Sequence, residues 1–150
     1  MAFSQVTVQV PATTANLGPG FDCLGVALSL HNRFQFTKQA AGTSPVEIIV
    51  QGQEAAGVST NTDNLLYRAF TQFYEDFGET PPPIKIEIEL GVPLSRGLGS
   101  SATAIVGGLL AANTFAGHPL EHPDLLRKAI ALEGHPDNIV PAFLGGCRLA

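Results

Sequence analysis

The chain has few cysteines, few basic residues and no long apolar run. Its 150 residues include two cysteines, 8 lysines and arginines, and 13 aspartates and glutamates, for a net charge of −5. Two cysteines far apart in the sequence argue against a disulfide framework and favour reduced thiols in a cytoplasmic protein. The acidic balance argues against nucleic acid or an anionic membrane as the main partner. Because no leader pattern and no run that could span a bilayer is present, we expect no membrane partner.

Several kinds of functional site are also missing. His31, His118 and His122 have no ligand spacing, which argues against a zinc site. No Gly-Lys-Ser or Gly-Lys-Thr occurs, which excludes a Walker phosphate loop. Residues 97–102 fit the Gly-x-Gly-x-x-Ala pattern of dinucleotide-binding folds, but there the first glycine follows its strand directly. Here residues 91–96 intervene. Neither repeats nor low-complexity tracts divide the chain, so we expect one domain with a substantial core.

Hydrophobic periodicity predicts an α+β domain. Alternation of apolar and polar residues predicts strands at residues 6–10, 25–37, 46–50 and 84–90, with a further strand beginning near 147. Capping and spacing signals predict helices that start at Thr62 or Asp63, at Ser100, near Pro123 and, as a last turn, at Asp137. The polar face of strand 84–90 favours antiparallel neighbours. We therefore expect a largely antiparallel sheet with packed helices. Gly107 and Gly108, in the middle of the Ser100 helix, would let that helix approach the sheet closely.

The loop before the Ser100 helix is the most informative segment. Its glycines let the backbone come close to a ligand, and the helix start offers free N–H groups at the positive end of its dipole. Such a site is typical of phosphate binding and predicts a nucleotide ligand; the simpler alternative is a glycine-rich turn that Ser100 caps. The candidate phosphate-binding residues are Pro93, Leu94, Ser95, Arg96, Gly97, Leu98, Gly99, Ser100, Ser101, Ala102 and Thr103.

This loop resembles the Pro-x-x-x-Gly-Leu-Gly-Ser-Ser-Ala motif of the galactokinase, homoserine kinase, mevalonate kinase and phosphomevalonate kinase superfamily. Residues 11–22, which read Pro-Ala-Thr-Thr-Ala-Asn-Leu-Gly-Pro-Gly-Phe-Asp, resemble the N-terminal signature of homoserine kinases. Residues 133–138, Glu-Gly-His-Pro-Asp-Asn, resemble another of their signatures. Thr103 stands where the superfamily more often has alanine, a change from which we expect little effect. Glu133 stands closer to His-x-Asp-Asn than in other members.

The resemblance implies that L-homoserine and ATP are converted to O-phospho-L-homoserine and ADP, a step toward threonine. It implies a fold like domain 2 of ribosomal protein S5. Residues 1–150 would be the N-terminal ATP-binding domain of a truncated two-domain kinase whose C-terminal domain is absent. Because a domain cut at a strand exposes apolar surface, we expect a homodimer. The alternatives are a mevalonate- or sugar-type kinase, a catalytically silent nucleotide-binding module, or an RNA-binding domain, which would need a basic surface.

The resemblance also assigns the cofactors ATP and Mg²⁺. Mg²⁺ prefers hard oxygen ligands, and the candidates are Ser101 and Glu133. A carboxylate near the end of its own helix is unfavourable for the helix dipole, so Glu133 is expected to have a functional reason for its place. Asn16, Asp22 and His135 are assigned to L-homoserine, with Asp22 on the ammonium group. For Asn16 and Asp22 the alternative is an Asx turn, and for His135 an ordinary hydrogen-bonded loop side chain.

The remaining candidates are Asp137 and Asn138 for catalysis, and Asn61 and Asn64 for the adenine. Asp137 would accept the proton of the substrate hydroxyl; its alternative role is to cap the last helical turn. Helix capping is likewise the alternative for Asn61 and Asn64. Arg96 either adds positive charge to the phosphate site or is a solvated loop cation.

Overall fold

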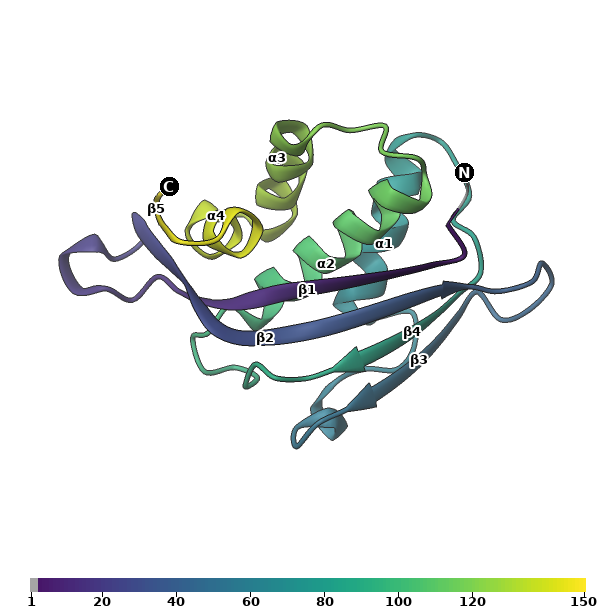
Figure 1. Cartoon of the computed structure of the whole chain (residues 1–150), viewed down its shortest axis with the longest axis horizontal. Coiled ribbons are helices and arrows are strands. Elements are labelled where there is room, and N and C mark those ends of the chain that lie inside the picture. The colour runs from purple at the N-terminus through teal and green to yellow at the C-terminus, as the bar shows by residue number, and fades with distance from the viewer. Residues whose placement is uncertain (1–2) are drawn as a thin grey trace.

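The structure is a computed structural model that describes residues 3–150. Helices cover one face of a mixed β-sheet (Figure 1). The strands are β1 (Gln5–Thr14), β2 (Leu24–Lys38), β3 (Val46–Gln51), β4 (Ile84–Glu89) and β5 (Cys147–Leu149). The helices are α1 (Leu65–Asp76), α2 (Ser100–Phe115), α3 (His122–Glu133) and α4 (Pro136–Leu144), with short 3-10 turns η1 (Gly18–Gly20) and η2 (Ala55–Gly57). The α+β prediction is therefore confirmed.

The sheet has the strand order β1-β2-β4-β3, and β5 pairs with β2 off this path. β2 is antiparallel to β1, β4 and β5, as expected, whereas β3 and β4 are parallel. The expectation of antiparallel neighbours for residues 84–90 thus holds on one side only. Helix α1 lies between β3 and β4 in the chain, and such a crossover returns the second strand in the same direction as the first.

The core lies between the helices and one face of the sheet. Phe34 and Phe36 of β2 are 2% and 0% exposed, and the Phe36 ring stacks on Phe70 of α1 with ring centroids 5.6 Å apart. The opposite sheet face is polar, because successive side chains of a strand point to opposite sides; Arg33 pairs there with Glu89. α2 is buried almost all round, which its apolar composition predicts.

The two glycines inside α2 serve different contacts. A Cβ atom on Gly107 would lie 2.5 Å from the Phe34 ring, so Gly107 approaches the sheet as predicted. A Cβ atom on Gly108 would lie 2.4 Å from the Leu66 carbonyl oxygen, so Gly108 instead lets α2 approach α1. Both positions exclude a side chain because the helix is packed against neighbours on two sides.

Three boundaries differ from the sequence expectations. β1 continues past Pro11 to Thr14, and its register shifts between Pro11 and Thr13; a bulge of this kind accommodates a proline within a strand. The cap of α1 is Asn64 rather than Thr62 or Asp63. α4 begins at Pro136 with His135 as its N-cap residue, so Asp137 lies inside the first turn and does not cap it.

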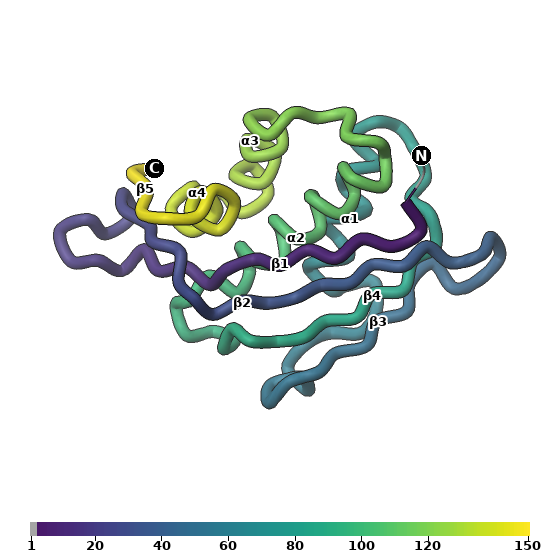
Figure 2. The backbone as a smooth tube through the Cα atoms, in the orientation of Figure 1, coloured from purple at the N-terminus to yellow at the C-terminus, as the bar shows by residue number. Residues whose placement is uncertain are grey.

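The extension of β1 matters because it carries the chain to the loop between β4 and α2 (residues 90–99), which contains most of the predicted phosphate loop. The Thr13 amide donates a hydrogen bond of 3.0 Å to the Leu98 carbonyl oxygen. The β1–β2 connection then extends at the end of the sheet where α4 and the C-terminus lie (Figure 2). Within residues 3–150, no helix has both the length and the hydropathy to cross a membrane.

Candidate functional site

The loop between β4 and α2 has alternating backbone handedness. Ser95, Gly97 and Gly99 have positive φ angles of 53°, 69° and 66°, whereas the residues between them do not. Alternation of this kind turns successive N–H groups toward one concave side and creates a nest that binds anions. Glycine adopts positive φ easily, but Ser95 does so at a cost, which is typical of a functional loop.

The start of α2 adds to this anion site. Gly99 is its N-cap residue, no described side chain caps it, and its first turn contains no acidic residue. Ser100 is the first helical residue, so the alternative in which Ser100 caps the helix is wrong. The first N–H groups of a helix lack intrahelical partners, and a long helix concentrates positive potential there. The nest and the helix start are adjacent in the chain, and both features are of the kind that binds anions.

A cavity of about 390 Å³ follows this loop. Of the eleven predicted phosphate-binding residues, Leu94 to Ser101 line it, together with Asn16, Gly57 and Asn138. Pro93 does not line this cavity and instead borders another one beside Arg96. Ala102 and Thr103 are 0% exposed. Thr103 instead lines an adjoining cavity, and Ala102 lines neither of the two.

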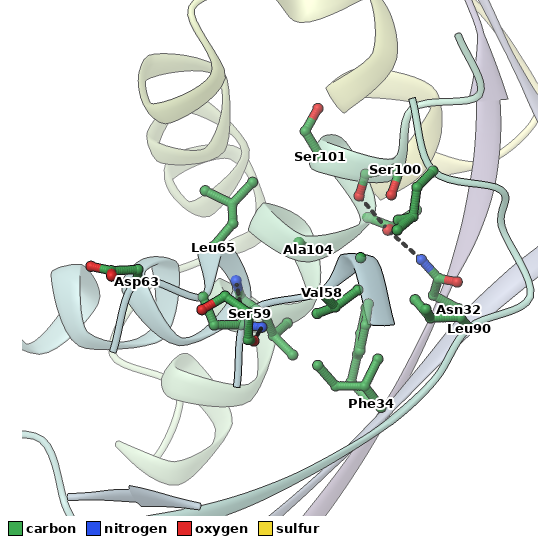
Figure 3. A pocket seen from close by; sticks show the side chains of 16 residues that line it. Asn32, Phe34, Val58, Ser59, Asp63, Leu65, Leu90, Ser100, Ser101 and Ala104 are labelled. Carbon is green, nitrogen blue, oxygen red and sulfur yellow. Dashed lines mark hydrogen bonds between the residues drawn. The ribbon is translucent and has the colours of Figure 1, made fainter. Parts of the chain in front are cut away.

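An adjoining, more apolar cavity of about 210 Å³ lies between α1, η2 and the sheet (Figure 3). Phe34, Val58, Leu65 and Leu90 contribute apolar surface to it. The two cavities share four residues, which are Gly57, Leu94, Ser100 and Ser101. A ligand with a flat apolar group joined to an anionic group would therefore fit across both.

Asn32 of β2 holds both ends of the loop, a role that sequence reasoning missed. Its Oδ1 accepts hydrogen bonds from the amides of Gly91 (2.9 Å) and Val92 (3.0 Å). Its Nδ2 donates to Thr103 Oγ1 at 2.8 Å, and the Thr103 hydroxyl donates to the Ser100 carbonyl at 2.7 Å (Figure 3). Thr103 is therefore not a neutral replacement for alanine. Its hydroxyl completes a buried polar network behind the loop.

Glu54 is a second residue that the sequence did not reveal. Its carboxylate accepts hydrogen bonds from the Leu94 amide (2.6 Å) and the Arg96 guanidinium (3.1 Å). These bonds, the Leu94 amide first, hold the pKa of Glu54 below its ordinary value. Arg96 is therefore an exposed loop cation that pairs with Glu54. No motif could have indicated Glu54, because it precedes the loop by 40 residues.

Ser101 and Glu133, the predicted Mg²⁺ ligands, lie together. The Ser101 hydroxyl donates to Glu133 Oε1 at 2.6 Å. Glu133 is the last residue of α3, but its carboxylate faces the positive N-terminal end of α2, which offsets the unfavourable dipole of its own helix. Within residues 3–150, no group of three or more His, Cys, Asp and Glu side chains could hold a metal. A Mg²⁺ ion here would need oxygens from a ligand and from water, which Mg²⁺ ordinarily uses.

Asn138 lies at the cavity wall, where three elements meet. Its Oδ1 accepts a hydrogen bond of 2.9 Å from Thr13 Oγ1 of β1. A Cβ atom on Gly99 would lie 2.1 Å from the same Thr13 oxygen. The Asp137 carboxylate accepts a hydrogen bond of 2.9 Å from the backbone N–H of Asn138. Neither Asp137 nor the exposed His135 lines the cavity. The structure thus places one of the two predicted catalytic residues directly at the site.

The two predicted substrate residues of the N-terminal segment are separated. Asn16 lines the cavity, and its Nδ2 would be 3.2 Å from a Cβ atom on Gly97. Asp22 is exposed in the β1–β2 connection, has a positive φ of 61°, and does not line the cavity. Within the described part of the chain, neither side chain makes an Asx-turn hydrogen bond, so that alternative is not supported.

Asn61 and Asn64 have local structural roles. Asn61 Oδ1 accepts from the Ser59 hydroxyl (2.7 Å) and the Asp63 amide (2.8 Å), and Asn61 does not line the apolar cavity. Asn64 does line it, but its Oδ1 accepts from the Leu66 amide at 3.0 Å and its Nδ2 donates to the Ser59 carbonyl at 2.6 Å. Helix capping, the alternative for Asn64, is therefore confirmed.

Comparison with known proteins identifies the family. The family profile described as the GHMP kinases N terminal domain matches residues 64–146, which is more than half of the chain. The chain belongs to the GHMP kinase family. This stretch of the GHMP kinase fold begins at the cap of α1 and contains the phosphate loop, α2, α3 and α4.

Individual GHMP kinases extend this result. Homoserine kinase of Microchaete diplosiphon is 63% identical over 147 residues, which is 98% of this chain and 47% of that protein. The crystal structure of homoserine kinase from Cytophaga hutchinsonii has a TM-score of 0.85 at 29% identity and covers 99% of this chain and 49% of that one. Mevalonate kinase of Methanococcus jannaschii shares the fold, with a TM-score of 0.72 at 17% identity, and covers 96% of this chain and 52% of that one. The chain spans about half the length of the curated relatives it matches.

Proposed function

We propose that residues 1–150 form the N-terminal ATP-binding domain of a two-domain cytoplasmic homoserine kinase. The enzyme would transfer the terminal phosphoryl group of ATP to the hydroxyl of L-homoserine and release O-phospho-L-homoserine and ADP. The observation that carries the proposal is the placement of Asn16 and Asn138 on the wall of the cavity that the phosphate loop lines. Phosphoryl transfer needs donor and acceptor side by side, with charge neutralised around them.

The two joined cavities support ATP as the donor. The base would occupy the apolar cavity beside Val58 and Leu65, and the phosphates would follow the nest toward Ser100 and Ser101. N–H groups of the loop and the start of α2 would bind the phosphate oxygens. Arg96 would add one formal positive charge to the rim of the cavity.

The hydroxyl of Ser101 and the carboxylate of Glu133 fit Mg²⁺, because both are hard oxygen donors and they lie within 2.6 Å of each other beside the phosphate cavity. When bound, Mg²⁺ would neutralise negative charge on the phosphates. Glu133 would hold the Ser101 hydroxyl in place.

L-homoserine would bind on the side of the cavity that β1 and α4 supply. Asn16 and Asn138 would contact its polar groups, while Asp22 and His135, which lie farther out, would meet its ammonium end. Asp137 would accept the hydroxyl proton. Since phosphoryl transfer proceeds mainly by positioning and electrostatic stabilisation, loss of Asp137 should slow the reaction less than loss of the phosphate site.

The first test is a calorimetric titration of Mg·ATP into the 150-residue chain and into its Ser101→Ala variant. We expect saturable binding that the substitution weakens, with circular dichroism showing that the variant is folded. Because the chain spans only about half the length of its curated relatives, we expect little homoserine-dependent ADP formation from it alone. Rapid turnover by the unassisted chain would contradict this, and a folded chain that binds no Mg·ATP would contradict the nucleotide site.

A fusion tests the acceptor. The chain is joined to the remaining half of the Microchaete diplosiphon homoserine kinase, and ADP release is measured with L-homoserine, mevalonate and galactose. We expect turnover with L-homoserine only, and we expect the Ser101→Ala fusion to lose it. Turnover with mevalonate or a sugar would favour the related kinases instead, and binding without any turnover would favour a catalytically silent nucleotide-binding module.

A further inference from the structure

Glu54 places negative charge beside a site for anions. It precedes η2, and its two carboxylate oxygens bind two groups of the phosphate loop, the Leu94 amide and the Arg96 guanidinium. Like charges repel, so a carboxylate at this place should by itself weaken phosphate binding. Its presence therefore needs a reason other than simple charge balance.

We propose that Glu54 is a positioning residue that orients the Arg96 guanidinium toward bound phosphates and fixes the first half of the phosphate loop. This inference rests on the nucleotide function proposed above. Arg96 lines the 390 Å³ phosphate cavity while it is paired with Glu54. Arginine has five N–H donors, and the pair engages one terminal nitrogen, so donors remain for a phosphate.

The space around Arg96 explains why it needs a restraint. Arg96 also lines a second cavity, of about 570 Å³, together with Glu54, Gly91 and Pro93. The Arg96 side chain is 66% exposed and has no other ion-pair partner among the described residues. Without Glu54, the exposed guanidinium would sample several rotamers over both cavities and would lose this rotamer freedom on binding a phosphate.

Glu54 also connects the loop to the apolar cavity. Three residues later, Gly57 lines both the apolar and the phosphate cavities, and a Cβ atom on Gly57 would lie 3.0 Å from Leu94 Cδ1. The bond from the Leu94 amide to Glu54 thus fixes the passage between the two cavities. The same bond lowers the pKa of Glu54 below its ordinary value because the amide N–H favours the charged carboxylate.

Substitution of Glu54 by glutamine distinguishes the positioning of Arg96 from simple repulsion of phosphate. The Glu54→Gln variant would keep an acceptor for the Leu94 amide but lose the charged partner of Arg96. If Glu54 positions Arg96, the Kd for Mg·ATP rises by up to about fivefold, the upper end of the range for an exposed ion pair. If Glu54 only repels phosphate, the Kd falls. The matched control is Glu121→Gln, the same change of charge at an exposed residue that follows the C-terminal end of α2. Helix α2 is about 24 Å long, so this residue lies far from the start of α2.

The experiment is calorimetry with Mg·ATP and with adenosine on the unmodified chain, Glu54→Gln, Arg96→Gln and the double variant. We expect Glu54→Gln to weaken Mg·ATP but not adenosine, and to have no further effect once Arg96 is replaced. Unchanged or tighter Mg·ATP binding by Glu54→Gln would overturn the inference while leaving the nucleotide site intact, and so would an equal loss for adenosine. Absence of any binding by the folded, unmodified chain would instead overturn the proposed function, and this inference with it.

Discussion

Replacement of Thr103 by valine should destabilise the protein although the two side chains have nearly the same shape. The Thr103 hydroxyl receives the Asn32 Nδ2 hydrogen bond of 2.8 Å and donates to the Ser100 carbonyl at 2.7 Å. Both Asn32 and Thr103 are at most 2% exposed. Valine would leave the Asn32 amide donor without its partner in the interior, and an unsatisfied buried donor costs about 1–3 kcal/mol.

A second variant separates the hydroxyl from the methyl group of Thr103. Serine keeps the hydroxyl and removes one buried methyl group, which costs about 1 kcal/mol. We therefore expect Thr103→Val to lose at least as much stability as Thr103→Ser, and Thr103→Ala to combine both losses. Stability would be measured by urea unfolding, followed by circular dichroism because the chain has no tryptophan.

Coupling to Asn32 completes this test. In Asn32→Asp, the carboxylate still accepts from the Gly91 and Val92 amides, but no longer donates to Thr103. The effect of Thr103→Val should then shrink in the Asn32→Asp background by about 1 kcal/mol or more, since contacting residues are not additive. A Thr103→Val protein as stable as the unmodified chain would refute the reasoning about the buried network.

Three further predictions concern other parts of the molecule. Gly25→Ala should cost about 1–3 kcal/mol in urea unfolding and displace α4, because the new Cβ atom would lie 2.0 Å from the Asp137 carbonyl oxygen; full stability would show that α4 shifts freely. Asp76 is bound by Lys128, which lowers its pKa below 3.8, so Lys128→Gln should cost about 0.2–1 kcal/mol at pH 7. That difference should persist above pH 3.8 and disappear as the pH falls through the lowered pKa of Asp76; a difference that grows in acid would be contrary. Sedimentation equilibrium at micromolar concentration should show a homodimer, and a monomer would count against the expectation from exposed apolar side chains such as Leu149, which is 82% exposed.

The phosphate loop and most elements could be predicted from the sequence because their signals are local. Alternating isoleucines identified β4, and the Gly-Leu-Gly-Ser-Ser run identified a tight turn into a helix start. These residues act mainly through their own backbone, whose preferences depend on near neighbours. The errors at Asn64 and His135 are shifts of helix boundaries, at which several capping residues compete within a few positions. The error at Thr14 arises because a bulge lets β1 continue past Pro11.

The partners of the loop could not be predicted in this way. Asn32 and Thr103 are 71 residues apart, and Glu54 is 42 residues from Arg96. An asparagine in a strand and a glutamate in a turn have no distinctive pattern, and only the packing of β2 and η2 against the loop gives them partners. The parallel pairing of β3 with β4 likewise depends on the crossover through α1.

The sequence by itself therefore determined the local conformation of the loop before α2 and predicted an anion site there, because glycine conformation and free helix N–H groups are properties of a short segment. The tertiary structure decided which residues hold that segment in shape and which candidates reach it. It brought Asn16, Asn138 and Glu133 to the loop, left Asp22 and Asn61 away from it, and buried Thr103 behind it. The physical reason is that side-chain hydrogen bonds require short distances in space. For residues far apart in the sequence, these distances are fixed only when the sheet and helices pack.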